Sequence, residues 1–354
     1  MIAYSRFSTL AITMLAFTAC TSTPKAPSAD SSAALATPAT ANTGPLTPGE
    51  LAAFAPLPTQ MLAGAVAPSE DVVALGRALF YETVLSGGHN ASCNSCHPLN
   101  GFGADGRARS FGDHGQTGGR NAPTVYNAAG QIAQFWDGRA ATVEEQAKGP
   151  ILNPAEMGMP DAEAVLVHLR AMPTYRAQFA KAFPGERTPI TYDNAGKAIG
   201  AFERGLVTPS RWDAALGGDT TALTPDERQG ARLFVSTGCA ACHNGAYVGG
   251  SMYMRAGLKS PWPMHGDSGR YAVTRKPEDL FVFKVPSLRN VAMTGPYFSD
   301  GSVATLDEAI LLMGRHQIGV ELSTHDVALL KAFLGSLTGT IPVAYIAYPQ
   351  LPTK

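Results

Sequence analysis

The chain is poor in charge, in cysteine and in long apolar runs, and each shortage excludes a class of protein. Only 16% of its 354 residues are charged and the formal net charge is −1, so it lacks the basic surface that nucleic-acid binding requires. Five cysteines are too few for a disulfide scaffold in a chain of this length. Beyond residues 1–20, no stretch stays apolar for long enough to form a transmembrane helix.

Glycine and proline, by contrast, are abundant. The chain contains 37 glycines and 26 prolines, about 18% of all residues against roughly 12% in average proteins. This excess predicts a loop-rich protein, and such a protein often needs a group other than its side chains to fill the core. The length is sufficient for two domains, each with its own core.

The N-terminus has the layout of an export signal. Residues 1–20 contain one basic residue, Arg6, before an apolar run from Phe7 to Ala19 that is too short to span a membrane as a mature helix. The run ends at Phe-Thr-Ala-Cys, which resembles a bacterial lipoprotein box and predicts a lipid anchor at Cys20. Simple cleavage near Ala19 is the alternative. Residues 21–45, rich in alanine, threonine, serine and proline, are predicted to form a flexible linker.

The other four cysteines form two copies of the pattern C-x-x-C-H, which is the attachment signature of c-type haem. In this pattern the two thiols bond to the haem vinyl groups, and the adjacent histidine reaches the iron from the same short helix. The alternatives are a redox dithiol or a zinc site. One copy of the pattern could arise by chance, but not two copies that use every cysteine except Cys20 in an exported chain. The sequence therefore predicts two haem c groups, held by Cys93, Cys96 and His97 and by Cys239, Cys242 and His243.

Similar sequences precede both motifs, which indicates an internal duplication. Residues 76–80 read Gly-Arg-Ala-Leu-Phe and residues 230–234 read Gly-Ala-Arg-Leu-Phe, and each segment is predicted to end a first helix that packs beside the haem. We therefore predict a mainly α fold of two tandem cytochrome c-like domains, each around one covalently bound c-type haem. Their predicted bounds are 46–210 and 211–354.

Apolar residues at three- and four-residue spacing predict helices along much of the remaining chain, and no run of alternating strands is present. Predicted helices include 161–171, 173–183 and 192–207. In the C-terminal half, Thr224 is followed by proline and then by glutamate at the third position, which predicts a helix N-cap. A helix that opens at Thr305 is expected to end at Gly314, and a last helix is capped near Ser323.

Taken together, these features resemble the bacterial di-haem cytochrome c peroxidases and the related MauG-type enzymes. Besides the haem motifs, the resemblance rests on segments at 121–124, 134–139, 145–150, 156–157, 294–298 and 313–314, and it extends from about Leu51 to Pro352. It implies an enzyme that reduces hydrogen peroxide to water with electrons from a small cytochrome c or a copper protein. It also implies a periplasmic location and, by analogy alone, a homodimer.

The resemblance assigns sixth ligands to both irons, and that ligand sets the chemistry of a haem held by one histidine. Met313 matches the sixth ligand of the electron-donating C-terminal haem, although it could also be a core residue. Met293 is a rival, and weaker candidates are Met252, Met254 and Met264. His114, in a glycine-rich loop, matches the distal histidine of the N-terminal haem, with a spacing to Asn121 about one residue short.

His89 is the other histidine near the first motif, but it lies only four residues before Cys93 and cannot easily reach the opposite face of the haem. The remaining histidines are expected to be structural or solvated: His168, His265, His316 and His325. Of these, His316 is close to Met313 and is retained as a minor ligand candidate.

Further residues match the family's catalytic and calcium positions. Glu156 matches a distal glutamate that can take a proton from peroxide and return one to the leaving oxygen, whereas the chain alone would suggest a solvated loop carboxylate. Gln146 matches a glutamine that orients peroxide. Trp136 matches the tryptophan between the haems, with simple packing as the alternative. An interdomain calcium ion is implied at Asn121, Thr294 and Pro296, whose oxygens suit a hard cation.

The sequence is also compatible with two other functions. One is a MauG-like enzyme that uses peroxide to oxidise a protein side chain, which the retention of Met313 and His114 disfavours. The other is a di-haem protein that only transfers electrons, which Glu156 and Gln146 disfavour because such a protein does not need a distal acid–base pocket.

Overall fold

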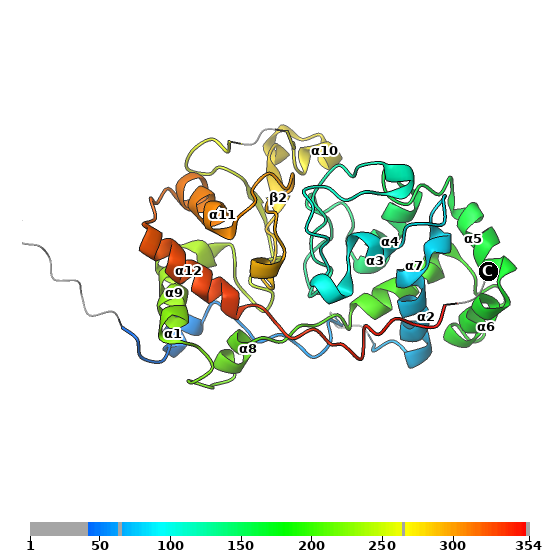
Figure 1. Ribbon diagram of the computed structural model, residues 1–354, viewed down its shortest axis with the longest axis horizontal. Helices are drawn as coiled ribbons and strands as arrows, with labels where there is room; N and C mark the ends of the chain where they lie inside the picture. Colours follow the sequence, from blue (N-terminus) through cyan, green and yellow to red (C-terminus); the bar gives the residue numbers. More distant parts are fainter. Residues whose placement is uncertain (1–41, 63–65, 264–265, 352–354) are drawn as a thin grey trace, which may run out of the picture. The chain divides into compact units, whose positions relative to one another are not determined.

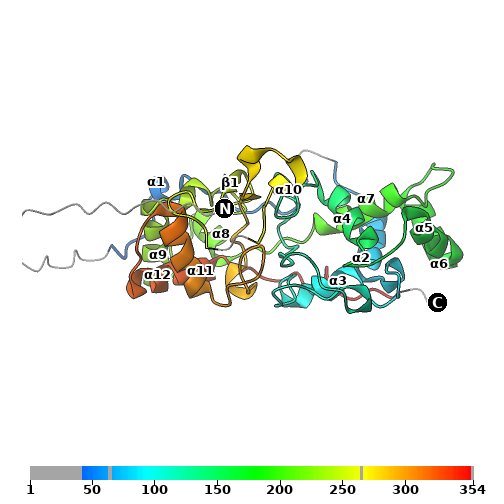
Figure 2. The same cartoon turned by 90° about the horizontal axis from the view of Figure 1, so that it is seen from above.

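A computed structural model describes residues 42–62, 66–263 and 266–351. The predicted export signal, Cys20 and residues 21–41 of the predicted linker lie outside the described residues. The described part is mainly helical, as predicted, and its helices form two groups that are visible in both views (Figures 1 and 2). None of the described helices combines the length and the hydropathy that a membrane span needs.

The first group of helices surrounds the first cysteine motif. Helix α7 (Tyr192–Glu203) packs against both α2 (Glu70–Tyr81) and α4 (Val143–Leu152). Next to them lie the short helix α3 (Cys93–Cys96), α5 (Ala162–Ala171) and α6 (Pro173–Ala182). Their apolar faces enclose one core, which includes Leu79, Phe80, Phe179 and Phe202.

The second group contains the second cysteine motif. It consists of α8 (Arg211–Leu216), α9 (Pro225–Ser236), α11 (Leu306–Leu312) and α12 (Thr324–Ser336), with the short helices α1 (Pro48–Leu51) and α10 (Tyr271–Thr274). Strands β1 (Tyr253–Arg255) and β2 (Val282–Lys284) form a two-stranded antiparallel sheet in which Tyr253 pairs with Lys284. The second core includes Trp212, Phe234 and Phe333.

The repeated pentapeptide has the same role in both groups. Its glycine lies where two helices cross so closely that no side chain fits. A Cβ atom at Gly76 of α2 would lie 1.8 Å from the carbonyl oxygen of Ala198 in α7. In the second group, a Cβ atom at Gly230 of α9 would lie 2.0 Å from the carbonyl oxygen of Leu329 in α12. The sequence repeat therefore corresponds to a repeated helix crossing.

Segments at both ends of the described chain pack on the group that is distant in sequence, as Figure 1 shows for the red C-terminal segment. Near the N-terminus, Arg232 of α9 pairs with Glu50 at 2.7 Å. Near the C-terminus, Tyr345 stacks on Phe202 of α7 with ring centroids 5.2 Å apart. The proposed boundary at residues 210 and 211 stays a prediction, and the two cores lie on either side of it apart from these end segments.

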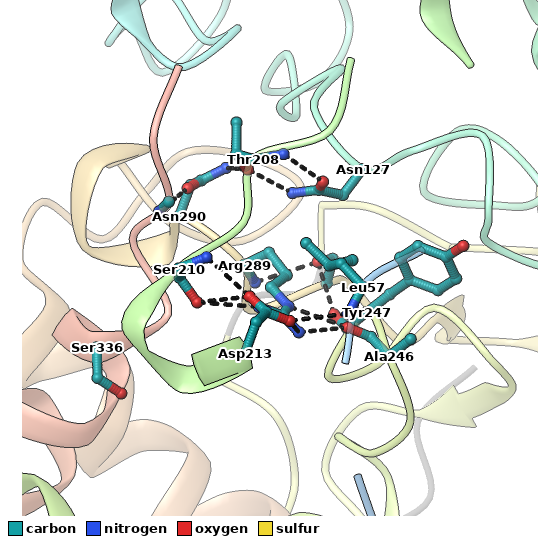
Figure 3. Close-up of polar contacts among 12 residues, drawn as sticks. Leu57, Asn127, Thr208, Ser210, Asp213, Ala246, Tyr247, Arg289, Asn290 and Ser336 are labelled. Atoms are coloured by element: carbon teal, nitrogen blue, oxygen red, sulfur yellow. Dashed lines mark hydrogen bonds and ion pairs between the residues drawn. The ribbon is translucent and has the colours of Figure 1, made fainter. Parts of the chain in front are cut away.

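A buried polar network connects the segment before α8 to both groups (Figure 3). The Arg289 guanidinium, which is fully buried, forms two hydrogen bonds to the Asp213 carboxylate at 2.6 and 2.8 Å. Thr208 Oγ1 accepts hydrogen bonds from the side-chain amides of Asn127, at 2.8 Å, and of Asn290, at 2.9 Å. Residues 127 and 290 belong to different halves of the chain, so this network fixes the connection between them.

The predicted helix starts are confirmed, whereas two predicted ends are wrong. Thr224 and Ser323 form capping boxes at the starts of α9 and α12. Helix α7 ends at Glu203 rather than at residue 207. The helix expected to end at Gly314 continues through a π-helical turn, Met313–Ile318, because contacts from a distant loop hold that turn. Among these, the backbone N–H of Gly257 donates to Gln317 Oε1 at 2.9 Å.

Candidate functional site

The first cysteine motif lies on one helical turn that presents a histidine at its end. Helix α3 carries Cys93 and Cys96, both partly buried and both free thiols, and His97 is its C-cap residue. His97 Nδ1 lies 3.1 Å from the carbonyl oxygen of Gly103. Since a carbonyl can only accept, Nδ1 carries the proton and Nε2 keeps its lone pair free for a metal. Burial lowers the pKa of His97, which favours the neutral form.

Gly103 makes this arrangement possible. Its backbone is in the left-handed region, with φ of +70°, and a Cβ atom there would lie 2.9 Å from Val125 Cγ2. The same loop is held by Thr124 Oγ1, which donates to the carbonyl of Phe102 at 2.6 Å. The segment 121–124 therefore positions the histidine of the first motif.

The glycine-rich loop that contains His114 packs against the turn that contains Glu156. A Cβ atom at Gly112 would lie 2.4 Å from the Glu156 carbonyl oxygen, so only glycine allows this approach. The next residue, Asp113, donates its backbone N–H to the same carbonyl at 2.5 Å. The loop also reaches the cysteine motif, since Cys96 Sγ lies 3.9 Å from the carbonyl oxygen of Phe111.

His114 itself points outward in this structure. Its side chain is 75% exposed, and its Nε2 lies 3.4 Å from Asp113 Oδ2. Its φ of +52° is unusual for a residue with a side chain. The adjacent Asp113 is buried, and its carboxylate accepts hydrogen bonds from the backbone N–H groups of Gly88, at 2.7 Å, and of His114, at 3.0 Å. Asp113 thus connects the His114 loop to the segment that precedes the cysteine motif.

Glu156 is half-buried, and it lies close enough to the first motif for its charge to act there. It follows α4, and its Oε1 accepts a hydrogen bond from Asn153 Nδ2 at 2.9 Å. Burial raises the pKa of Glu156, and the Arg139 guanidinium and the Asn153 hydrogen bond oppose that rise. Burial also raises the pKa values of the Cys93 and Cys96 thiols, and the negative charge of Glu156 adds to both effects.

Gln146 and Arg139 lie in the segment that leads to the Glu156 turn. Gln146 is half-buried on α4, the helix that leads into the Glu156 turn. Arg139 lies over the ring of Phe135, with 3.4 Å between its Cζ and the ring centroid, and pairs with Asp137 at 3.1 Å. These contacts fix the position of the Arg139 guanidinium, whose positive charge lowers the pKa of Glu156.

The second motif forms a short 3-10 turn, Cys239–Ala241, followed by a buried histidine. His243 Nδ1 is buried and has no hydrogen-bond partner among the described residues, although the carbonyls of Val248 and Pro286 are nearby. Burial lowers the pKa of His243 to about 4, and the two carbonyls raise it by a smaller amount. Because the imidazole is neutral, one of its ring nitrogens is free to bind a metal.

A cavity of about 310 Å³ adjoins this motif. Its walls include both cysteines and the histidine of the motif and residues of α9, α11 and α12. Met313 also lines it, at the junction between α11 and the π-helical turn. The structure therefore brings together the four side chains predicted to hold the C-terminal haem: Cys239, Cys242, His243 and Met313.

The other methionine candidates differ in position. Met254 of β1 lines the same cavity, whereas the side chain of Met293 is 51% exposed. Met252 is half-buried, and Met264 lies outside the described residues. Met313 and Met254 are thus the candidates that the fold places at the cavity.

The predicted calcium residues and Trp136 line this same cavity. Asn121, Thr294 and Pro296 are part of its wall. Trp136 Nε1 donates to the backbone carbonyl of Asn121 at 2.9 Å, and Asn121 Nδ2 donates to the carbonyl of Arg107 at 2.9 Å. Within the described ranges, no group of three or more histidine, cysteine, aspartate or glutamate side chains is arranged to hold a metal ion.

The remaining histidines have contacts away from the two motifs. The rings of His89 and His168 lie edge to face, with centroids 4.8 Å apart. His316 Nδ1 lies 2.9 Å from Ser260 Oγ, and its ring contacts Trp262. His325 is exposed on α12, and His265 lies outside the described residues.

Two residues of interest were missed by sequence reasoning. Asp113 was not singled out from the sequence, and its burial and its hydrogen bonds with Gly88 and Glu156 distinguish it in the structure. Lys284 is a buried lysine on the cavity wall. Its position within the apolar run Phe-Val-Phe-Lys-Val was a signal that could have identified it.

Comparison with known proteins agrees with these features. Residues 70–221 match the family described as di-haem cytochrome c peroxidase. The chain is 44% identical to the cytochrome c551 peroxidase of Pseudomonas aeruginosa over 86% of this chain and 88% of the relative. It is also 44% identical to the cytochrome c551 peroxidase of Nitrosomonas europaea over 80% and 85% of the two chains. The crystal structure of a MauG-like protein associated with microbial copper homeostasis has a TM-score of 0.74 and 31% identity, covering 83% of this chain and 97% of that one. The chain therefore belongs to the di-haem cytochrome c peroxidase family.

Proposed function

We propose that this protein reduces hydrogen peroxide, so that one peroxide, two electrons and two protons give two water molecules, with electrons from a small cytochrome c or a copper protein. The observation that carries the proposal is the position of Glu156. Its half-buried carboxyl has a raised pKa and lies against the loop that reaches the first cysteine motif. The names of the relatives at 44% identity support the same activity.

The residues of both motifs fit covalently bound haem. In each motif two free thiols precede a histidine whose pKa is lowered by burial, and the second motif adjoins a cavity that Met313 also lines. We propose His97 and His243 as iron ligands and Met313 as the sixth ligand in the C-terminal half. Haem bound at these residues would supply redox chemistry at iron. A thioether ligand favours the ferrous state, which suits electron entry at the C-terminal site.

Glu156 would move the protons. A carboxyl whose pKa is raised by burial can both accept a proton from hydrogen peroxide and return one to the leaving oxygen. Asn153, which donates to Oε1, fixes the orientation of the carboxyl. Gln146 would orient peroxide from α4. Trp136 would support electron transfer between the two sites. It lines the cavity beside the second motif, where its indole N–H donates to the backbone carbonyl of Asn121.

His114 would act as a displaceable sixth ligand at the N-terminal site. We propose that the outward orientation seen here corresponds to the released state, in which the exposed imidazole pairs with Asp113. The backbone contacts of Gly112 and Asp113 with Glu156 keep the loop beside the site while the side chain points away.

Replacing His114 by glycine tests this assignment. Glycine tolerates the φ of +52° at this position, so the variant should fold normally. We expect its fully oxidised form to turn over peroxide at once and to show a high-spin haem, whereas the unaltered protein should first require one-electron reduction. His325→Ala, at an exposed histidine of α12, should behave as the unaltered protein. A variant that still needs reduction would mean that another group blocks the iron.

A calcium ion is proposed between Asn121, Thr294 and Pro296. The support is chemical: an amide oxygen, two backbone carbonyls and water are ligands that a hard cation accepts, and the three residues share one cavity wall. Chelation should lower peroxide turnover, and added Ca²⁺, but not Mg²⁺, should restore it. Full activity in a chelated protein that contains no calcium by elemental analysis would contradict the site.

The MauG-like alternative is less well supported, because the MauG-like structure is 31% identical to this chain and the peroxidases are 44% identical. The periplasmic location, the lipid anchor at Cys20 and the homodimer stay predictions from the sequence and the resemblance.

A further inference from the structure

Lys284 is a buried cation that lacks a carboxylate partner. Its side chain is in the buried class, and its Nζ contacts the side-chain oxygen of Gln131. Within residues 42–62, 66–263 and 266–351, it forms no ion pair with an acidic side chain. Its backbone is fixed on both sides, since it pairs with Tyr253 in the sheet and its N–H donates to the Trp136 carbonyl at 2.9 Å.

Comparison with Arg289, a second buried cation, shows that Lys284 needs a negatively charged partner. Arg289 is fully buried, but Asp213 neutralises it through two hydrogen bonds. An ammonium group that leaves water without a counter-charge costs several kcal/mol, and lysine is rarely buried unless it is paired. Burial alone lowers the pKa of Lys284 to about 8. An amide such as Gln131 supplies one hydrogen-bond acceptor but no negative charge.

The position of Lys284 indicates where the counter-charge comes from. Lys284 and Gln131 line the cavity that Cys239, His243 and Met313 also line. A haem attached at this motif brings two carboxylates, its propionates, into a region whose protein walls are largely apolar. Asp267 also lines the cavity, but it is already paired with Arg120 at 2.7 Å.

We propose that Lys284 binds a propionate of the C-terminal haem and thereby raises the reduction potential of that haem. The proposal rests on the assignment of this haem to Cys239, Cys242 and His243. Reduction adds one negative charge at the iron, so a fixed positive charge beside a propionate stabilises the reduced form. Loss of Lys284 would leave that propionate without a counter-charge and would lower the potential.

The test is a redox titration of the complete di-haem protein, followed by visible absorption of each haem. Lys284→Met removes the charge but keeps an unbranched side chain, and Lys284→Arg keeps the charge. Lys276→Met, at an exposed lysine in the same half, is the matched control. We expect Lys284→Met to lower the equilibrium constant for reduction of the C-terminal haem at least tenfold, which is a downward shift of 59 mV for a one-electron couple. In Lys284→Arg and in Lys276→Met, this equilibrium constant should stay within tenfold of its value in the unaltered protein.

A smaller fall, or a rise, of the C-terminal haem potential in Lys284→Met would overturn the proposal. An equal fall of that potential in Lys284→Arg would also overturn it, because packing rather than charge would then be the cause. If Lys284→Met does not fold, Lys284→Gln is titrated under the same criterion. Failure of the proposed function is distinguishable, because the unaltered protein would then not turn over peroxide. Failure of the Lys284 proposal alone would leave the peroxide turnover of the unaltered protein intact.

Discussion

Replacement of Glu156 by glutamine is expected to lower peroxide turnover by roughly 10²–10⁴-fold, the usual contribution of a general acid–base group. The amide is nearly the same size and can still accept the Asn153 hydrogen bond, so the turn after α4 should stay in place. It cannot, however, accept a proton and release it within the reaction. Turnover is measured with a reduced small cytochrome as donor, on protein poised at one electron.

The matched control is Glu163→Gln, because Glu163 is an exposed carboxylate on α5 that pairs with Arg170 at the surface. Absorption spectra of both variants should be identical to those of the unaltered protein, which separates loss of chemistry from loss of haem. If Glu156→Gln turns over peroxide at the unaltered rate, Glu156 is not the proton-transfer group and the carboxyl merely packs beside the motif.

Replacement of Asp213 by alanine is expected to lower the free energy of unfolding by about 3–5 kcal/mol, because it leaves the Arg289 guanidinium buried without its partner. The guanidinium is fully buried, and both of its bonds to Asp213 are shorter than 3 Å. Asp213 also accepts the backbone N–H of Leu57 at 2.8 Å and caps α8 through Ser210 (Figure 3). The measurement is urea unfolding followed by far-ultraviolet circular dichroism.

Two further variants serve as controls for Asp213→Ala. Glu321→Ala removes an exposed ion pair with Arg315 and should leave the unfolding midpoint nearly unchanged. The double variant Asp213→Ala with Arg289→Met removes both charges and should recover part of the lost stability. An Asp213→Ala midpoint equal to that of Glu321→Ala would show that the buried Asp213–Arg289 pair drawn in Figure 3 does not stabilise the fold.

Local signals in the sequence were sufficient to predict the features that depend on local interactions. Thr224 and Ser323 cap helices through side chains within three residues, and the repeated pentapeptides correspond to one repeated helix crossing. The cysteine motifs were unambiguous because the residue order itself specifies their chemistry. The resemblance then indicated which methionine to consider, and the cavity wall includes it.

Features that depend on distant contacts could not be predicted in this way. The π-helical turn after Met313 is held by residues 257–260, more than 50 positions earlier in the chain, as the 60-residue separation of Gly257 and Gln317 illustrates. The outward orientation of His114 depends on the burial of Asp113 and on its bond to Gly88. Likewise, Lys284 is distinguished by its burial without an acidic partner in the part of the chain that the structure describes, which is a property of the fold and not of the local sequence.

In the proposed reaction, the protein passes electrons from a small donor to peroxide. The most direct measurement is the stoichiometry of that reaction, with reduced small cytochrome c in excess and a known amount of hydrogen peroxide added to half-reduced protein. We predict that two cytochromes are oxidised per peroxide in repeated turnovers, with no covalent change in any protein. Reduction of the haems by the cytochrome without any oxidation by peroxide would contradict the claim and leave a protein that only transfers electrons.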